Sequence, residues 1–243
     1  MLEVADIEAS HGLLRAVRGV SFKVEKGEVL GVIGANGAGK TTLFRAITGI
    51  HADMGGSVYL NGRDISALSP SKRLRAGLAM VPEGRRLFPD MTVRENLQVA
   101  GENGRKGQWT IETVLDAFPA LKPILRSAAG NLSGGQRQAV AIGRALMANP
   151  DVMIMDEVSL GLSPIAIEGL YESLEGLKSA GETAIIVVEQ DLRRATAFSD
   201  RLICMLEGAI VLEGQASALT HDEITNAYFG LDTTDGGEAA IHA

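Results

Sequence analysis

One octapeptide limits the possible folds of this chain more than any other feature. Residues 34–41 read Gly-Ala-Asn-Gly-Ala-Gly-Lys-Thr, which matches G-x-x-x-x-G-K-[ST], and they directly follow the apolar run 29–33. A strand that ends in a glycine-rich turn and leads into a helix points several backbone N–H groups at one spot, where the helix dipole adds positive potential. Lys40 can reach the β- and γ-phosphates of a nucleotide, and the Thr41 hydroxyl can bind Mg²⁺. The loop predicts a nucleoside-triphosphate site in an α/β fold.

The simpler interpretation is a glycine turn with a surface lysine. It is disfavoured because a strand and a helix (residues 42–48) are expected on the two sides of the loop, as a phosphate site requires. The following residues are expected to contact the nucleotide: Gly34, Asn36, Gly37, Ala38, Gly39, Lys40, Thr41 and Thr42.

An acidic pair marks a second part of the expected site. Asp156 and Glu157 follow the short apolar run 152–155, which is typical of a buried strand. Because ligands of open α/β sheets collect at the carboxyl ends of strands, the pair is expected beside the phosphate loop. Asp156 suits a Mg²⁺ contact, direct or through water, and Glu157 can polarise an attacking water. Alone, the pattern is equally expected where a buried strand reaches solvent.

A third segment, Leu132-Ser133-Gly134-Gly135-Gln136, stands before a stretch with helical pattern (residues 138–148). A serine and bare glycine backbone at a helix N-terminus form a second anion site. An ordinary serine N-cap is the alternative, and it would be preferred if the segment stood alone. We include Ser133, Gly134, Gly135 and Gln136 among the expected nucleotide contacts.

The three segments together resemble the ATP-binding-cassette (ABC) ATPases, and the resemblance covers residues 1–230 approximately. It implies an α/β fold: a P-loop NTPase core with an antiparallel β subdomain and an inserted α-helical subdomain at about residues 86–150. It also implies that residues 132–136 are the family's signature segment and that the active site is composite. In such a site two cassettes pack head to tail, and each ATP lies between the phosphate loop of one cassette and the signature segment of the other. Ser133 and Gly135 would then act on a nucleotide held by another subunit.

Composition limits the class of partner and the compartment. The chain has 243 residues, 46% of them hydrophobic, a net charge of −7 and a single cysteine, Cys204. No basic block is visible, which argues against nucleic acid as a partner. One cysteine cannot form an internal disulfide, which is consistent with a reducing cytoplasm. No apolar run approaches the ~20 residues of a membrane span, so an association with a membrane would need other subunits.

The coarse order of elements supports one cassette over residues 1–232. The patterns predict strands over 2–7, 20–24, 28–33, 57–60, 78–81, 152–155 and 184–188, and a hairpin of 201–207 with 209–213. They predict helices over 70–76, within 92–125 apart from a loop at 101–107, and over 164–180. The polar tail, residues 233–243, is expected to be disordered.

Five positions depart from the common cassette pattern. Glu83 stands where a loop usually offers glutamine to the metal and the attacking water, and Gln190 stands at the switch position, usually histidine. Val158 and Ser163 replace a proline and an aspartate after the acidic pair. His11 stands where a tyrosine usually stacks on adenine, and an imidazole can still stack on a purine. We expect Glu157, Gln190 and Glu83 to be catalytic, and Thr41, Asp156 and Glu83 to face Mg²⁺.

The combination of residues 81–85, 159–162 and 188–190 is similar to one subgroup, the shorter ATP-binding subunits of branched-chain amino-acid importers. This resemblance implies ATP and Mg²⁺ as cofactors, and a place on the cytoplasmic face of the membrane. It also implies three partners: a second and different cassette chain, permease subunits and, indirectly, an extracytoplasmic solute-binding protein. The main alternative that stays open is a cassette for urea or short amides. A soluble non-transport ABC ATPase is less favoured, because no paired cassette, coiled-coil insert or basic face is visible, and Asp156 and Glu157 argue against a regulatory module without turnover.

Overall fold

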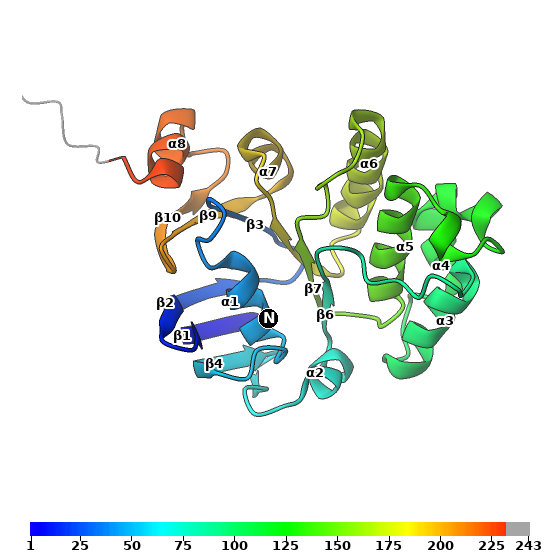
Figure 1. Ribbon diagram of the computed structural model, residues 1–243, viewed down its shortest axis with the longest axis horizontal. Coiled ribbons are helices and arrows are strands. Elements are labelled where there is room, and N and C mark those ends of the chain that lie inside the picture. The colour runs from blue at the N-terminus through cyan, green and yellow to red at the C-terminus, as the bar shows by residue number, and fades with distance from the viewer. Residues whose placement is uncertain (232–243) are drawn as a thin grey trace, which may run out of the picture.

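The computed structural model describes residues 1–231 as two sheets with helices around them, and the expected disordered tail lies outside the described residues (Figure 1). A six-stranded sheet has the order β10-β9-β3-β8-β7-β6, and a four-stranded sheet has the order β2-β1-β4-β5. The six-stranded sheet is parallel except for its edge strand β10, whereas the smaller sheet is antiparallel throughout. The expected α/β core and antiparallel β subdomain are both confirmed.

The centre of the parallel sheet carries the segments of interest. Its strands are β3 (Val29–Ile33), β6 (Leu78–Val81), β7 (Val152–Asp156), β8 (Ala184–Val188), β9 (Arg201–Leu206) and the edge strand β10 (Ala209–Gln215). Every residue of β3, β7 and β8 is buried, as expected for strands with both faces covered. The hairpin around Gly208 is confirmed as the antiparallel pair β9–β10.

The antiparallel sheet is larger than the sequence pattern predicted. It consists of β1 (Leu2–His11), β2 (Leu14–Val24), β4 (Met54–Leu60) and β5 (Arg63–Asp64). β1 and β2 extend almost to the turn between them, since their outer ends pair with each other. These outer ends are exposed to solvent and lack the apolar pattern by which strands are recognised in a sequence, so they were not predicted. His11 is therefore the last residue of a strand and not part of a loop.

The helices divide into two groups. α1 (Lys40–Ile47) and α2 (Pro70–Ala76) lie beside the antiparallel sheet, whereas α3 (Val93–Asn103), α4 (Ile111–Ala117) and α5 (Gly134–Leu146) gather beyond β6, at the right of Figure 1. The short 3-10 turns η1 (Pro119–Ile124) and η2 (Ala129–Asn131) connect α4 to α5. This group stands between β6 and β7 in the sequence, where an inserted helical subdomain was predicted.

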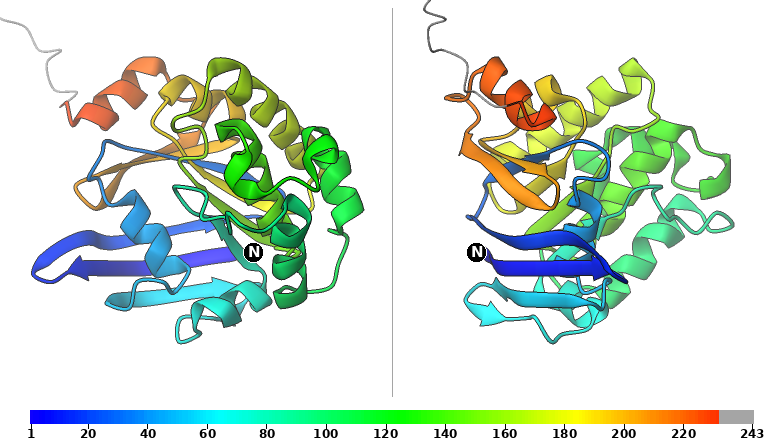
Figure 2. Two further views of the ribbon diagram at one scale, coloured as in Figure 1. Left: turned by 45° about the vertical axis from the view of Figure 1, so that its right-hand side comes forward. Right: turned by 60° about the vertical axis from the view of Figure 1, so that its left-hand side comes forward.

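Three further helices belong to the carboxyl-terminal part of the chain and pack near the parallel sheet (Figure 2). They are α6 (Pro164–Ala180), α7 (Leu192–Phe198) and α8 (His221–Phe229). α6 matches its predicted range, but α7 and α8 were not predicted. Both carry a recognisable N-cap: Asp191 accepts from the Arg194 amide, and Thr220 forms a capping box with Glu223. No helix among residues 1–231 is long and apolar enough to cross a bilayer.

Two other boundaries differ from the prediction. α3 continues through Gly101 to Asn103, so the expected loop at 101–107 begins later. α5 starts at Gly134 instead of residue 138, because Ser133 caps it and the two glycines form its first turn. Thr92 and Glu95 form a capping box at the start of α3.

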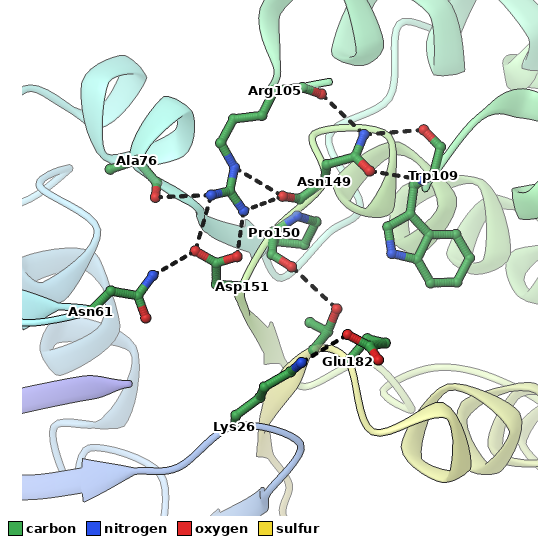
Figure 3. A network of polar contacts seen from close by, with 10 residues as sticks. Lys26, Asn61, Ala76, Arg105, Trp109, Asn149, Pro150, Asp151 and Glu182 are labelled. Carbon is green, nitrogen blue, oxygen red and sulfur yellow. Dashed lines mark hydrogen bonds and ion pairs between the residues drawn. The ribbon is translucent and has the colours of Figure 1, made fainter. Parts of the chain in front are cut away.

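A polar network fastens the loop after α3 to the start of β7 (Figure 3). Arg105 forms a two-pronged ion pair with Asp151, at 2.6 and 3.0 Å, and Asp151 also accepts from Asn61 at 2.8 Å. The Asn149 side chain accepts from the Trp109 amide at 2.8 Å and donates to the Arg105 and Trp109 carbonyls. The network joins the helical group, the parallel sheet and the antiparallel sheet on the side where β7 begins.

Candidate functional site

Adjacent strands bring the phosphate loop, the acidic pair and the switch position to one edge of the sheet. β3 precedes the phosphate loop, β7 ends at Asp156, and β8, which lies between them, leads to Glu189 and Gln190. The Glu157 amide donates to the Val188 carbonyl at 3.0 Å, and the Gln190 Nε2 donates to Glu157 Oε1 at 2.8 Å. Two residues that are 33 positions apart in the chain thus form a direct hydrogen-bonded pair.

The phosphate loop can adopt its conformation only with glycine at key positions. Gly34 and Gly39 have φ of 146° and 99°, in the region that disfavours side chains. A Cβ on Gly34 would lie 2.3 Å from the Met205 carbonyl oxygen, and one on Gly39 would lie 2.3 Å from the Ala16 carbonyl oxygen. The backbone therefore passes against β9 and β2 too closely for any larger residue.

Lys40 is the cation of the site and is held inside its own loop. Its side chain is buried, and the ammonium donates to the Gly34 carbonyl at 2.5 Å and the Ala35 carbonyl at 3.1 Å. Burial lowers the pKa of Lys40, whereas the charges of Glu157 and Asp156 raise it. A triphosphate would offer this ammonium anionic acceptors in place of neutral carbonyls, and such charge-assisted bonds are the stronger ones.

The phosphate loop lines a cavity of about 260 Å³. Glu157 and His11 stand on its walls beside the loop, and the other predicted loop contacts on its lining are Asn36, Gly37, Ala38, Gly39, Lys40, Thr41 and Thr42. Gly34 contributes through its carbonyl, which accepts from Lys40. Seven of the eight loop positions predicted to contact the nucleotide thus surround one hollow.

His11 lies at the rim of this cavity and is exposed. Its Nε2 is 3.2 Å from the Thr42 hydroxyl, and its ring meets His51 edge to face at a centroid distance of 4.8 Å. His51 is fixed in turn by a 2.9 Å contact of its Nε2 with the Ser10 carbonyl. The imidazole is therefore placed where a base could stack, with His51 as a second histidine beside it.

Asp156 is the group best suited to a metal. It is 2% exposed, and neither carboxylate oxygen accepts a hydrogen bond of normal geometry from residues 1–231. Burial raises the pKa of Asp156 to about 6; the charges of Glu157 and Glu83 add to this, and the nearby Thr41 hydroxyl opposes it. A buried carboxylate without partners fits a hard cation, and Mg²⁺ is usually held by one or two carboxylates with waters and phosphates. Asp156 and Thr41 therefore fit Mg²⁺.

Glu83 reaches the acidic pair from the loop after β6. Together with Asp156 and Glu157 it lines a second cavity of about 210 Å³, whose walls also include Arg85, Gln138 and Leu160. Arg85 was not predicted from the sequence as a residue of the site. Its Nε donates to Gln138 Oε1 at 3.0 Å and its Nη2 to the Leu160 carbonyl at 3.2 Å, so it joins three segments that no local pattern connects.

The signature segment lies apart from its own phosphate loop. Ser133 caps α5: its hydroxyl accepts from the Gln136 amide at 3.3 Å, and Gln136 Oε1 accepts from the Ser133 amide at 2.9 Å. Ser133, Gly135 and Gln136 line a separate cavity of about 240 Å³, on the side of α6. Gly134 begins α5 between them. One chain therefore does not bring its signature and its phosphate loop to the same hollow.

Two of the departures from the common pattern have a structural explanation. Val158 is 1% exposed and packs in the core between the sheet and α6, where an apolar side chain is suited. The Ser163 hydroxyl accepts from the Ala166 amide at 3.4 Å and caps α6, a function that serine performs as well as aspartate.

Comparison with known proteins agrees with this architecture. The ABC transporter family matches residues 17–159. The chain is 39% identical to the high-affinity branched-chain amino acid transport ATP-binding protein BraG of Pseudomonas aeruginosa, over 95% of this chain and 100% of that protein. It is 33% identical to the probable branched-chain amino acid transport ATP-binding protein LivF of Archaeoglobus fulgidus, over 92% and 95% of the two chains.

Other relatives are named for other solutes. The xylose/arabinose import ATP-binding protein XylG of Sulfolobus acidocaldarius is 30% identical over 98% of both chains. Among solved structures, a nucleotide-free ATP-binding cassette from an ABC transporter is 32% identical, with a TM-score of 0.78 over 93% of this chain and 94% of that one.

Proposed function

The chain belongs to the ABC transporter family of ATPases, and from that premise we propose that it is the subunit that energises an importer of branched-chain amino acids. The observation that supports hydrolysis is the Gln190–Glu157 hydrogen bond, formed beside Lys40 and the Asp156 carboxylate, which has no hydrogen-bond partner within residues 1–231. The proposed solute rests on the relatives BraG and LivF, which match this chain over nearly its whole length.

Each residue of the site has a proposed function that follows from its chemistry. The backbone amides of the phosphate loop and the Lys40 ammonium bind the phosphates, and His11 stacks on the base. Thr41 and Asp156 would hold Mg²⁺, with Glu83 nearby, and the metal would supply positive charge to neutralise the phosphate oxygens. Glu157 orients the attacking water and accepts its proton, and Gln190 holds the Glu157 carboxylate in place.

We further propose that the site is completed by a second cassette. Ser133 and Gly135 lie in a hollow separate from the phosphate loop, so their hydroxyl and backbone N–H groups would contact a nucleotide held by another subunit. The proposed partner is a different cassette chain, and both chains would act on permease subunits at the cytoplasmic face of the membrane. A solute-binding protein on the opposite side would deliver the amino acid.

Reconstitution tests this function. The chain is co-expressed with the cassette and permease subunits that co-purify with it. Vesicles containing the complex are loaded with Mg-ATP and given labelled leucine or urea with the matching solute-binding protein. Leucine uptake that disappears with Lys40→Ala supports the proposal. Uptake of urea or a short amide instead of leucine would replace the solute and keep the ATPase, because the solute does not need to touch this subunit.

A further inference from the structure

A buried carboxylate next to the switch position has no part in the mechanism above. Glu189 is 2% exposed, and its two oxygens are each bound by a hydroxyl group. Ser159 donates to Oε2 at 2.7 Å, and Tyr171 donates to Oε1 at 2.8 Å. Ser159 belongs to the loop after the acidic pair, and Tyr171 belongs to α6, so the carboxylate joins two segments to the end of β8.

The backbone of the same residue is fixed to the strand that leads into the phosphate loop. The Glu189 amide donates to the Val32 carbonyl at 3.2 Å. The next residue, Gln190, donates to Glu157 Oε1. Glu189 is therefore one covalent step from the amide that holds Glu157, and its side chain fixes the loop that begins two residues after Glu157.

The buried Glu189 carboxylate needs both hydroxyl groups as hydrogen-bond donors. Burial raises the pKa of Glu189, whereas the bonds from Ser159 and Tyr171 and the charge of Arg194 lower it. The Arg194 guanidinium lies over the Tyr171 ring at 5.5 Å and also pairs with Asp191 at 3.5 Å. An ionised carboxylate is unfavourable in a buried site unless hydrogen bonds satisfy it, so the geometry of both donors is under strong constraint.

We propose that Glu189 is a positioning residue for ATP hydrolysis: it fixes the loop of Ser159 against the end of β8 and thereby holds Gln190, and through Gln190 the Glu157 carboxylate, in the geometry that hydrolysis requires. The proposal rests on the functions proposed above for Glu157 and Gln190. It differs from a purely structural explanation, which would place the effect of Glu189 on folding and leave the chemical step unchanged.

The test is a mutant cycle read out as steady-state ATP hydrolysis by the full-length chain assembled with its partner cassette. Glu189→Gln keeps the shape but makes one of the two acceptors a donor. We expect kcat to fall about tenfold with KM for ATP unchanged within about twofold, since a small misplacement of catalytic groups affects the chemical step first. In a Gln190→Ala background, Glu189→Gln should lower kcat by less than about twofold, because the residue through which it acts is gone.

Variants at the donor Ser159 keep the test decisive if Glu189→Gln folds poorly. Ser159→Ala should lower kcat and Ser159→Thr, which keeps a hydroxyl, should restore it. Glu172→Gln, an exposed glutamate next to Tyr171 on α6, is the matched control and should leave kcat unchanged. A wild-type kcat for Glu189→Gln and Ser159→Ala, or an undiminished effect of Glu189→Gln without Gln190, would overturn the proposal. Glu157→Gln is measured in parallel: normal hydrolysis by that variant would refute the proposed function of Glu157 and not the positioning contact alone.

Discussion

At the residue scale, Lys40 and Asp156 define opposite electrostatic requirements within one small volume. The ammonium is buried against neutral carbonyls, and the carboxylate is buried with no hydrogen-bond partner among the described residues. Burial of either charge raises the free energy of the nucleotide-free protein. When phosphates and a metal are bound, the ammonium faces anionic oxygens and the carboxylate faces a cation. The site is arranged for its ligand at the expense of the free protein.

Lys40→Ala is expected to weaken ATP binding at least tenfold and to abolish hydrolysis. The variant loses charge-assisted hydrogen bonds of about 1.5–3 kcal/mol each. Titration calorimetry with Mg-ATP measures the affinity. Lys26→Ala, which removes an exposed lysine paired with Glu182, is the control and should bind normally. Wild-type hydrolysis by Lys40→Ala would show that residues other than Lys40 bind the phosphates.

Asp156→Asn is expected to stabilise the free protein while abolishing hydrolysis. The folded-state pKa of about 6 lies above the ordinary value of 3.8, so Asp156 favours folding below about pH 4, and this contribution is lost as the pH rises through 6. At pH 7.5 the substitution removes an ionised buried group, which corresponds to about 2–3 kcal/mol of unfolding free energy. Urea unfolding without nucleotide and metal, compared with wild type at pH 4.5 and 7.5, should show a gain that grows with pH. A gain independent of pH would contradict this origin.

At the scale of elements, the polar network at the start of β7 fixes how the helical group joins the sheet (Figure 3). Arg105 donates to Asp151 and also to the Asn149 carbonyl at 3.1 Å, so one guanidinium closes both the turn before β7 and the loop after α3. Arginine suits this place because its planar fork can bond several acceptors in one plane, which a lysine cannot. The attachment is therefore stiff on this side of the helical group.

Arg105→Ala is expected to lower the unfolding free energy by about 2–3 kcal/mol, because it leaves Asp151 and the Asn149 carbonyl short of partners. Arg105→Lys should recover less than half of the loss. Lys106→Ala, an exposed neighbour, is the control and should change stability by less than about 0.5 kcal/mol. Denaturant unfolding measures all three. Equal stability of Arg105→Ala and Lys106→Ala would mean that the ion pair contributes nothing.

The loop of Glu83 joins the helical group on the other side, next to the acidic pair. An ionised glutamate only accepts hydrogen bonds, whereas glutamine both accepts and donates. We expect Glu83→Gln to change the ratio of basal to transport-coupled hydrolysis more than it changes ATP affinity. The loop follows β6 and precedes the helical group, and we propose that it is the hinge that faces the permease. Both rates are measured in reconstituted vesicles. An unchanged ratio with a large loss of affinity would make Glu83 a simple nucleotide ligand.

At the scale of the whole molecule, the separation of the signature from the phosphate loop makes association part of the proposed mechanism. Glu157→Gln keeps the hydrogen-bonding shape of the side chain but cannot accept a proton from water. We expect this variant to bind Mg-ATP, to lack turnover and to elute as a dimer in size-exclusion chromatography, alone or with the second cassette. The wild type should show that species only transiently. Normal hydrolysis by Glu157→Gln would place the base elsewhere.

The sequence by itself determined the buried strands of the parallel sheet, the phosphate loop and the family. Val29–Ile33, Val152–Asp156 and Ala184–Val188 are short apolar runs bounded by polar turns, and the loop carries its glycines at a fixed spacing. Such features depend on neighbours in the chain, which is why they can be read without a structure. The missed α7 and α8 are short, and their start signals, Asp191 and Thr220, are local as well.

Only the tertiary structure decided which side chains meet. The order of β3, β8 and β7 places Gln190 against Glu157, puts Arg85 between Gln138 and Leu160, and buries Glu189 between Ser159 and Tyr171. These pairs are separated by many residues, and no local periodicity encodes them. They arise because burial of the apolar strands fixes one sheet order, and every side chain beyond the strand ends must then satisfy its charge and hydrogen bonds with whatever that order brings beside it.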